Sequence, residues 1–187
     1  MKFPSILFGA MLFMSALAVH AATSDDMLIY SDRFNNGWGD SWSWMPRYAT
    51  NNPVYAGSNA MACVPSGQWQ AWWLKSATSV DATLYTNLTF WLNGGATGGQ
   101  SISVNGELNG SSSGLPSVSV TAPTNSWKQV IISLAALGIN NKTNLTVCFG
   151  ADESNDIANQ RDWRGIFPVG AALLARHRGI REHLNPN

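Results

Sequence analysis

The sequence predicts an all-β protein, an antiparallel β-sandwich or jelly roll, followed by an atypical C-terminal tail with a partly helical pattern. Three observations predict this fold. Short runs rich in β-branched and aromatic residues recur between residues 27 and 150. Clusters of Gly, Pro, Asn and Ser separate these runs and are typical of tight turns. Hydrophobic residues make up 45% of the 187 residues, which is enough to form a core.

The expected elements are short and closely spaced, as in sandwiches and jelly rolls. The eight expected strands are Met27–Asp32, Ala60–Val64, Ala71–Lys75, Leu88–Asn93, Ser101–Val104, Ser117–Thr121, Lys128–Leu134 and Asn144–Phe149. One helical turn is expected at Leu134–Leu137.

Residues 1–21 have the pattern of an export signal. A basic n-region, Met1-Lys2, precedes an apolar stretch of 14 residues, 6–19, which is too short to span a bilayer. Cleavage is expected after Ala21, with Ala18 as the alternative. We therefore expect a secreted protein whose mature form has no membrane segment and whose β domain covers residues 22–150.

Residues 151–187 differ from the domain in composition. The domain has 6 acidic and 5 basic residues in 129 positions, whereas the tail has 5 of each in 37. Residues 168–184 have an amphipathic helical pattern, and no strand that would close the sheet is recognisable after Phe149. The tail is either a genuine C-terminal helix or interaction segment, or a segment foreign to the domain, as a shifted reading frame would produce. We favour the second interpretation.

Two covalent features follow from export. Cys63 and Cys148 can form a disulfide in an oxidising compartment, or they can be two free, buried thiols in separate strands, and the sequence leaves both open. The number of N-glycosylation sequons is close to that expected by chance, so they permit glycans without establishing them. The sequons start at Asn87, Asn109, Asn141 and Asn144.

Charge and residue content exclude several functions. The net charge is zero and charged residues are only 12%, so a phosphate-tracking nucleic-acid binder is not expected. The domain contains no His, which removes His-based triads and His-rich zinc sites. Glu107 and Asp40 are the pair we considered for a carboxylate-based glycosidase, and nothing in their context supports it. We expect a non-catalytic protein without cofactors. A structural calcium held by Asp25, Asp26 or Asp32 matches no recognisable loop pattern.

Tryptophan carries the main functional signal. Trp38, Trp42 and Trp44 lie within seven residues, and Trp42 and Trp44 would point to the same side of an extended chain. We expect one of the three to be core. Strand alternation places Trp73 and Trp91 on polar strand faces, where an indole can stack on the C–H face of a sugar. The expected hydrogen-bonding partners of that sugar are Asp40, Gln70 and Asn93, and the Trp residues assigned to the core are Trp69, Trp72 and Trp127.

The domain resembles the carbohydrate-binding-module-like jelly-roll domains of secreted cell-wall-active proteins, over about residues 27–150. The segments that carry this resemblance are Ile29–Asp32, Gly37-Trp38, Trp42–Trp44, Gly57–Ala60, Leu88–Gly95 and Trp127–Leu134. Two departures are visible. Ser41 makes the Trp-rich opening one residue longer, which can re-aim Trp42 and Trp44, and the expected closing strand is missing. The resemblance implies glycan binding without catalysis.

The sequence thus predicts a secreted, non-catalytic protein that binds a neutral polysaccharide, such as a β-glucan or chitin, on surface Trp residues. The alternative is a secreted cell-surface or cell-wall structural protein whose Trp residues are core. A carboxylate-based glycoside hydrolase is the third hypothesis.

Overall fold

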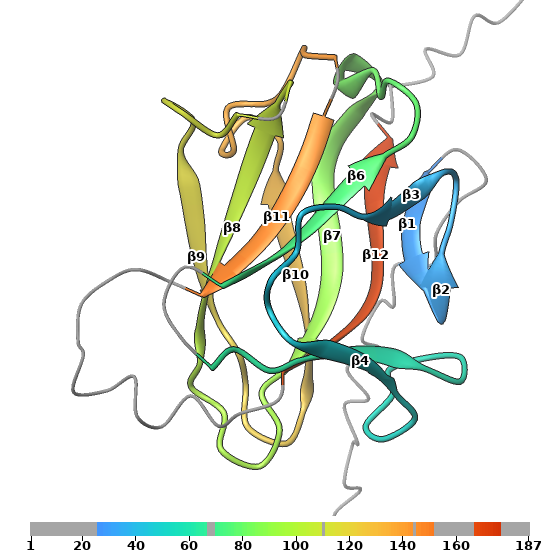
Figure 1. Cartoon of the computed structure of the whole chain (residues 1–187), viewed down its shortest axis with the longest axis vertical. Coiled ribbons are helices and arrows are strands. Elements are labelled where there is room, and N and C mark those ends of the chain that lie inside the picture. Colours follow the sequence, from blue (N-terminus) through green and yellow to red (C-terminus); the bar gives the residue numbers. More distant parts are fainter. Residues whose placement is uncertain (1–25, 67–69, 110, 144, 152–166, 177–187) are drawn as a thin grey trace, which may run out of the picture.

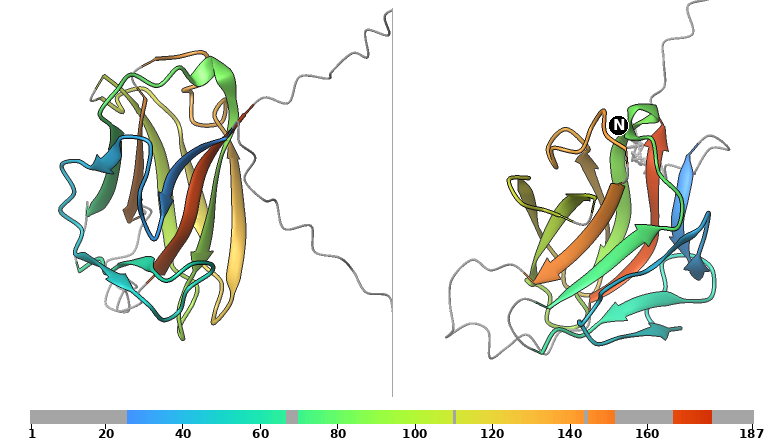
Figure 2. Two further views of the ribbon diagram at one scale, coloured as in Figure 1. Left: turned by 90° about the vertical axis from the view of Figure 1, so that its right-hand side faces the viewer. Right: turned by 45° about the horizontal axis from the view of Figure 1, so that its top comes forward.

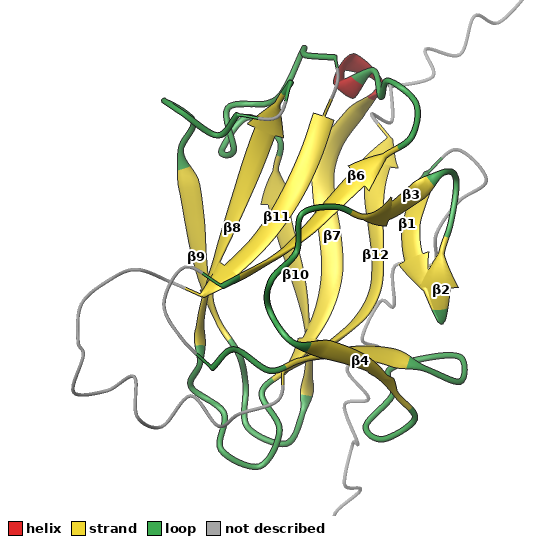
Figure 3. Cartoon of the chain, in the orientation of Figure 1, coloured by secondary structure: helices red, strands yellow, loops and turns green. Residues whose placement is uncertain are grey.

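A computed structural model describes residues 26–66, 70–109, 111–143, 145–151 and 167–176, and this part of the chain consists mainly of strands (Figure 3). The expected export signal lies outside the described residues. None of the helical structure in the described ranges is long and apolar enough to cross a membrane.

Within the described ranges, strands follow one another along the chain with a single short 3₁₀ turn among them. The elements are β1 (Met27–Ser31), β2 (Arg33–Phe34), β3 (Trp38–Asp40), β4 (Arg47–Thr50), β5 (Ala60–Cys63), β6 (Ala71–Ser76), η1 (Ala82–Leu84), β7 (Tyr85–Asn93), β8 (Ser101–Leu108), β9 (Ser117–Thr121), β10 (Trp127–Ser133), β11 (Leu145–Ala151) and β12 (Phe167–Arg176).

The described strands form two antiparallel sheets packed face to face (Figures 1 and 2). Sheet A has the order β10-β7-β12-β1-β2, with β5 also pairing β12 and β4 pairing β5. Sheet B has the order β3-β6-β11-β8-β9. The predicted all-β sandwich is therefore confirmed, and each of the eight expected strands is present, with identical bounds at Ser117–Thr121 and with ends shifted by one to four residues in the other seven.

The core lies between the inner faces of the two sheets. Leu88, Phe90 and Leu92 of β7 are fully buried from one side, and Trp72 and Leu74 of β6 from the other. This is the two-residue alternation that the sequence predicted for β6 and β7. Burying each such side chain contributes about 1.5–3 kcal/mol, so these alternating positions hold the sheets together.

An aromatic contact joins the two sheets directly. Tyr30 of β1 packs edge-to-face on Trp72 of β6, with ring centroids 6.0 Å apart. The assignment of Trp72 to the core is thus confirmed.

The prediction for the tail is wrong over residues 167–176. This segment forms β12, which lies between β1 and β7 (red in Figure 1) and buries Leu174 completely. It is the closing strand that the sequence analysis did not find. Its Ala-Leu-Leu-Ala run favours a helix, but strand pairing with two neighbours overrides that local preference, because otherwise both would present unpaired edges. Residues 152–166 and 177–187 lie outside the described part.

The structure has three further strands that the sequence analysis did not expect, and it has turns where one helical turn was expected. The strands β2, β3 and β4 are only two to four residues long and have little periodicity to detect. Residues 134–138 form hydrogen-bonded turns instead of the predicted helical turn.

Candidate functional site

The outer face of sheet B carries polar side chains along two neighbouring strands, β8 and β9. Strand alternation turns Ser101, Ser103, Asn105 and Glu107 of β8 outward, because Ile102 and Val104 are fully buried in the core. The outward residues of β9 are Ser117, Ser119 and Thr121, which are all exposed.

Strand register aligns an aromatic and an amide across this face. Trp73 of β6 pairs with Cys148 of β11, which pairs with Asn105 of β8, which pairs with Ser117 of β9. Neighbouring strands lie ~4.8 Å apart, so Trp73 and Asn105 are about 10 Å apart and Ser117 is one strand further. The face thus combines an indole at one end with neutral hydrogen-bonding groups at the other.

A second indole extends the aromatic end of the face. Trp44 lies against Trp73 with ring centroids 6.3 Å apart and planes tilted by 31°, and it is 54% exposed. Trp42 is 87% exposed. Its φ of +52° means that residues 42–44 are not an extended strand, so the orientation predicted for Trp42 and Trp44 does not apply.

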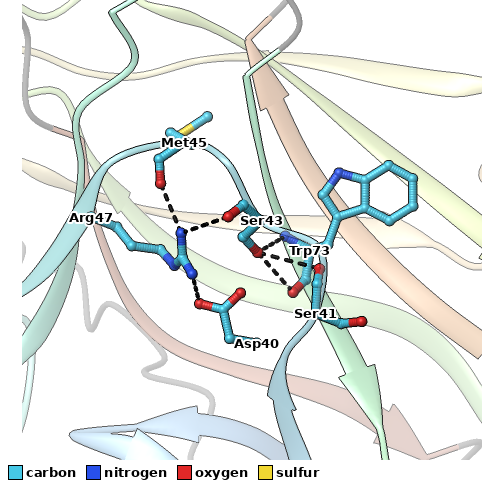
Figure 4. A network of polar contacts seen from close by, with 6 residues as sticks. All are labelled: Asp40, Ser41, Ser43, Met45, Arg47 and Trp73. Carbon is cyan, nitrogen blue, oxygen red and sulfur yellow. Dashed lines mark hydrogen bonds and ion pairs between the residues drawn. The ribbon is translucent and has the colours of Figure 1, made fainter.

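Residues 41–45, which carry Trp42 and Trp44, are hydrogen-bonded to the edge of β6 (Figure 4). Ser41 donates its backbone N–H to the carbonyl oxygen of Trp73 at 3.0 Å, and Met45 donates to Ala71 at 3.2 Å. Between them, the Ser43 hydroxyl accepts the backbone N–H of Trp73 at 2.9 Å. The Ser43 side chain thus takes the place that a backbone carbonyl has in a regular ladder.

Arg47 closes the other side of this segment. Its guanidinium donates to the carbonyl oxygens of Met45 at 2.8 Å and Ser43 at 3.5 Å, and it forms an ion pair with Asp40 (Figure 4). Asp40, predicted as a hydrogen-bonding partner of the ligand, is therefore engaged in holding the loop. Asp40 pairs with the buried Leu74, so this ion pair lies on the other side of sheet B from the Trp73 indole (Figure 4).

Glu107 is the one outward acid of β8 and is only 5% exposed. Burial raises the pKa of its carboxyl above the usual value, and the positive charge of Lys75 opposes this effect. Lys75 and Glu107 both pair with Thr146 of β11, so they occupy the same row of the sheet.

The candidate glycosidase pair is not assembled. Asp40 in β3 and Glu107 in β8 are separated by three strand positions, about 14 Å at ~4.8 Å per strand. Glycosidase carboxyl pairs lie about 5–9.5 Å apart. This separation argues against the hydrolase hypothesis.

Three predicted ligand-binding residues have structural roles. Trp38 is 4% exposed and donates its indole N–H to the Met27 sulfur at 3.2 Å, so it is the core residue of its group of three. Asn93 is 3% exposed and accepts the backbone N–H of Gly95, which caps a turn. Gln70 accepts the backbone N–H of Ser66 in a neighbouring loop. The sequence pattern could not separate these roles, because turn caps and ligand contacts use the same polar residues.

Trp91 lies on the outer face of sheet A, away from Trp73. The predicted polar strand face is correct, but one side of the indole is stacked by Tyr55 at 3.7 Å with an interplanar angle of 15°. Trp127 packs on the same tyrosine and is only partly buried, so its assignment to the core is wrong. Tyr55 was not predicted, because it lies in a loop without strand periodicity. Trp91 and Trp73 therefore cannot form one platform.

Cys63 is a free, fully buried thiol in sheet A, whereas Cys148 is in β11 of sheet B. The structure thus contains no disulfide at Cys63. Of the sequons, Asn109 and Asn141 are exposed with positive φ, and Asn87 is partly buried in β7. Asn144 lies outside the described residues.

The aspartates considered for calcium do not converge. The carboxylate of Asp32 accepts the backbone N–H groups of Ser58 and Asn59 at 2.8 and 2.7 Å. No group of three or more potential metal ligands occurs among the described residues. Asp25 lies outside them.

Known structures share this fold at low sequence identity. No protein-family model matches the sequence, and a search of curated proteins found no match. The family 30 carbohydrate-binding module of a cellulosomal cellulase of Clostridium thermocellum is 16% identical, with a TM-score of 0.55 over 82% of this chain and 99% of the other.

Two further structures with this fold are described together with the carbohydrate that they bind. A family 11 module from Clostridium thermocellum in complex with a β-1,3-1,4-mixed-linked tetrasaccharide is 13% identical (TM-score 0.52; 81% and 96% of the chains covered). The CBM22-2 xylan-binding domain of Xyn10C from Paenibacillus barcinonensis is 12% identical (TM-score 0.51; 74% and 91% covered). This chain therefore has the fold of the carbohydrate-binding modules.

Proposed function

We propose that this protein binds a neutral polysaccharide non-covalently, without cleaving it, on the outer face of sheet B. The observation that carries the proposal is the alignment of the Trp44–Trp73 pair with the outward serines and Asn105. An indole offers a flat apolar surface for the C–H face of a sugar ring, and the hydroxyl and amide groups match sugar hydroxyls.

The charge of this face favours a neutral ligand. Lys75 is the one basic residue on the described strands of this face, and it shares a row with Glu107. Tight binding of a polysaccharide rich in carboxylates or sulfates would call for several cations, which this face does not carry in the described ranges. The ligands of the fold relatives, a mixed-linkage glucan fragment and xylan, make these two polymers the first candidates. Cellulose, β-1,3-glucan and chitin complete the panel.

Export of the protein belongs to the same proposal. The signal expected in residues 1–21 would place the mature domain outside the cell, where such polymers occur.

Native affinity electrophoresis against these soluble polymers, and pull-down with the insoluble ones, tests the proposal. Trp73→Ala is expected to weaken binding of the preferred polymer at least about 10-fold, which corresponds to 1.4 kcal/mol for a central aromatic contact. Trp91→Ala on the opposite sheet is the matched control and should bind like the native protein. Folding of each variant is checked by circular dichroism.

The result separates the candidate functions. Folded native protein that binds none of the polymers would overturn the proposal and favour a structural or partner-binding role at the cell surface. Loss of binding in Trp91→Ala with normal binding in Trp73→Ala would place the site on sheet A instead.

A further inference from the structure

Trp42 combines two unfavourable features. It is the most exposed of the large hydrophobic side chains in the described ranges, at 87%. It also has φ of +52°, in the left-handed region that bulky side chains avoid. The other non-glycine residues with positive φ in these ranges are all Asp or Asn, whose short polar side chains bond locally in this conformation: Asp32, Asn36, Asn109, Asn125 and Asn141.

Contacts on both sides hold Trp42 in this conformation. Ser41 and Ser43 both bond to the backbone of Trp73, so the residue between them has no position in the ladder and is turned out, as in a β-bulge. Arg47 fixes the carbonyl of Ser43 from the other side. Backbone strain of this kind persists where the surrounding contacts enforce it, and it is frequent at ligand contacts. No packing advantage within the described chain accounts for Trp42, because its ring is almost entirely in solvent.

The position of Trp42 suggests a specific use. Its segment lies along the free edge of β6 at the level of Trp73, so it prolongs the row from Trp73 through Asn105 to Ser117 by one strand position. Trp73 to Asn105 covers about 10 Å, whereas the whole row from this segment to β9 covers about 19 Å at ~4.8 Å per strand. A short oligosaccharide can be held between Trp73 and Asn105 alone, but a longer chain would extend over the edge of the sheet.

We propose that Trp42 is a distal sugar contact that makes this protein selective for extended polysaccharide chains over short oligosaccharides. This inference rests on the proposed function and adds the length class of the ligand. Trp42 adds apolar contact area only for a chain that reaches beyond Trp73 and Trp44. The contacts that hold the backbone around Trp42 reduce the conformational entropy lost on binding.

The experiment compares each polymer with a disaccharide of the same sugar, which spans about the distance from Trp73 to Asn105: mixed-linkage β-1,3-1,4-glucan and cellulose with cellobiose, and xylan with xylobiose. Trp42→Ala is expected to weaken binding of the preferred polymer about 10-fold and to change the affinity for the corresponding disaccharide less than about 2-fold. Affinity electrophoresis or pull-down measures the first quantity and isothermal titration calorimetry the second. Tyr48→Ala is the matched control, because it also removes an exposed aromatic side chain but lies in β4 of sheet A, away from the proposed site.

A second variant separates binding from folding. Glycine adopts positive φ without strain, so Trp42→Gly should melt no lower than the native protein and still lose polymer binding as Trp42→Ala does.

Every outcome bears on the inference. Normal polymer binding by both Trp42 variants would overturn it while leaving the proposed function intact, provided that Trp73→Ala still weakens binding. Equal weakening for polymer and disaccharide would also overturn it, because Trp42 would then contact the same short stretch of sugar as Trp44 and Trp73. Native protein that binds no polymer would overturn both proposals together.

Discussion

The Ser43 hydroxyl is the contact on which the aromatic edge of sheet B depends. It accepts the backbone N–H of Trp73 at 2.9 Å and can donate to the carbonyl oxygens of Trp73 and Ser41 at 3.3 and 3.4 Å. Ser43→Ala removes this group and leaves the Trp73 N–H without its acceptor. An amide left unpaired in this way costs about 1–3 kcal/mol. Because the other bonds of the segment remain, we expect the domain to fold with its aromatic edge displaced.

This free energy corresponds to a measurable change in melting temperature. For a domain of this size, 1 kcal/mol lowers Tm by about 2–4 °C. Thermal melting followed by circular dichroism measures this change. Polymer binding should weaken in parallel, because the loop no longer holds Trp44 against Trp73. Ser43→Thr keeps the hydroxyl and should restore both properties.

Ser41→Ala is the matched control, because Ser41 contributes its backbone N–H to Trp73 at 3.0 Å. Its melting temperature should stay close to that of the native protein. If Ser43→Ala also melts within about 1 °C of the native protein and binds polymer normally, the reasoning about this anchor is refuted.

Three further predictions concern buried groups. Burial raises the pKa of the Glu107 carboxyl, so the native state binds more protons than the unfolded state, and the free energy of unfolding should fall as pH rises above the ordinary pKa of 4.5. Urea unfolding at several pH values measures this dependence, which should be weaker in Glu107→Gln. An equal pH dependence in both proteins would contradict the assignment. A Cβ on Gly106 would overlap Cγ2 of Ile139. Gly106→Ala should therefore lower the urea-unfolding free energy by about 1–3 kcal/mol. Gly39→Ala is the control and should change it less, because a Cβ there meets no neighbouring atom. Full burial raises the pKa of the Cys63 thiol. In a Cys148→Ser variant, a thiol reagent should therefore modify Cys63 only when guanidinium unfolds the protein. Rapid reaction of the native protein would contradict the burial of Cys63.

Much of the sandwich follows from local pattern. The strands β5 to β11 were predicted because alternating side chains must face core or solvent in turn, and turn residues mark where each strand ends. The same alternation correctly assigned Trp72 and Leu74 to the core and turned Trp73 and Trp91 outward.

Contacts between distant segments decided the rest. The strand β12 has a helix-favouring composition, and the gap between β1 and β7 makes it a strand. One side of the Trp91 indole is covered because Tyr55 folds onto it from a loop. The conformation of Trp42 depends on a hydroxyl at Ser43 that bonds to Trp73, 30 residues further along the chain.

The sequence by itself therefore determined the fold class, the strand positions and the polar, Trp-bearing character of the strand faces, because these depend on the order of neighbouring residues. Only the tertiary structure decided which Trp residues share a face and which are already covered. Those relations depend on strand order and register, which bring together residues that are far apart in the chain.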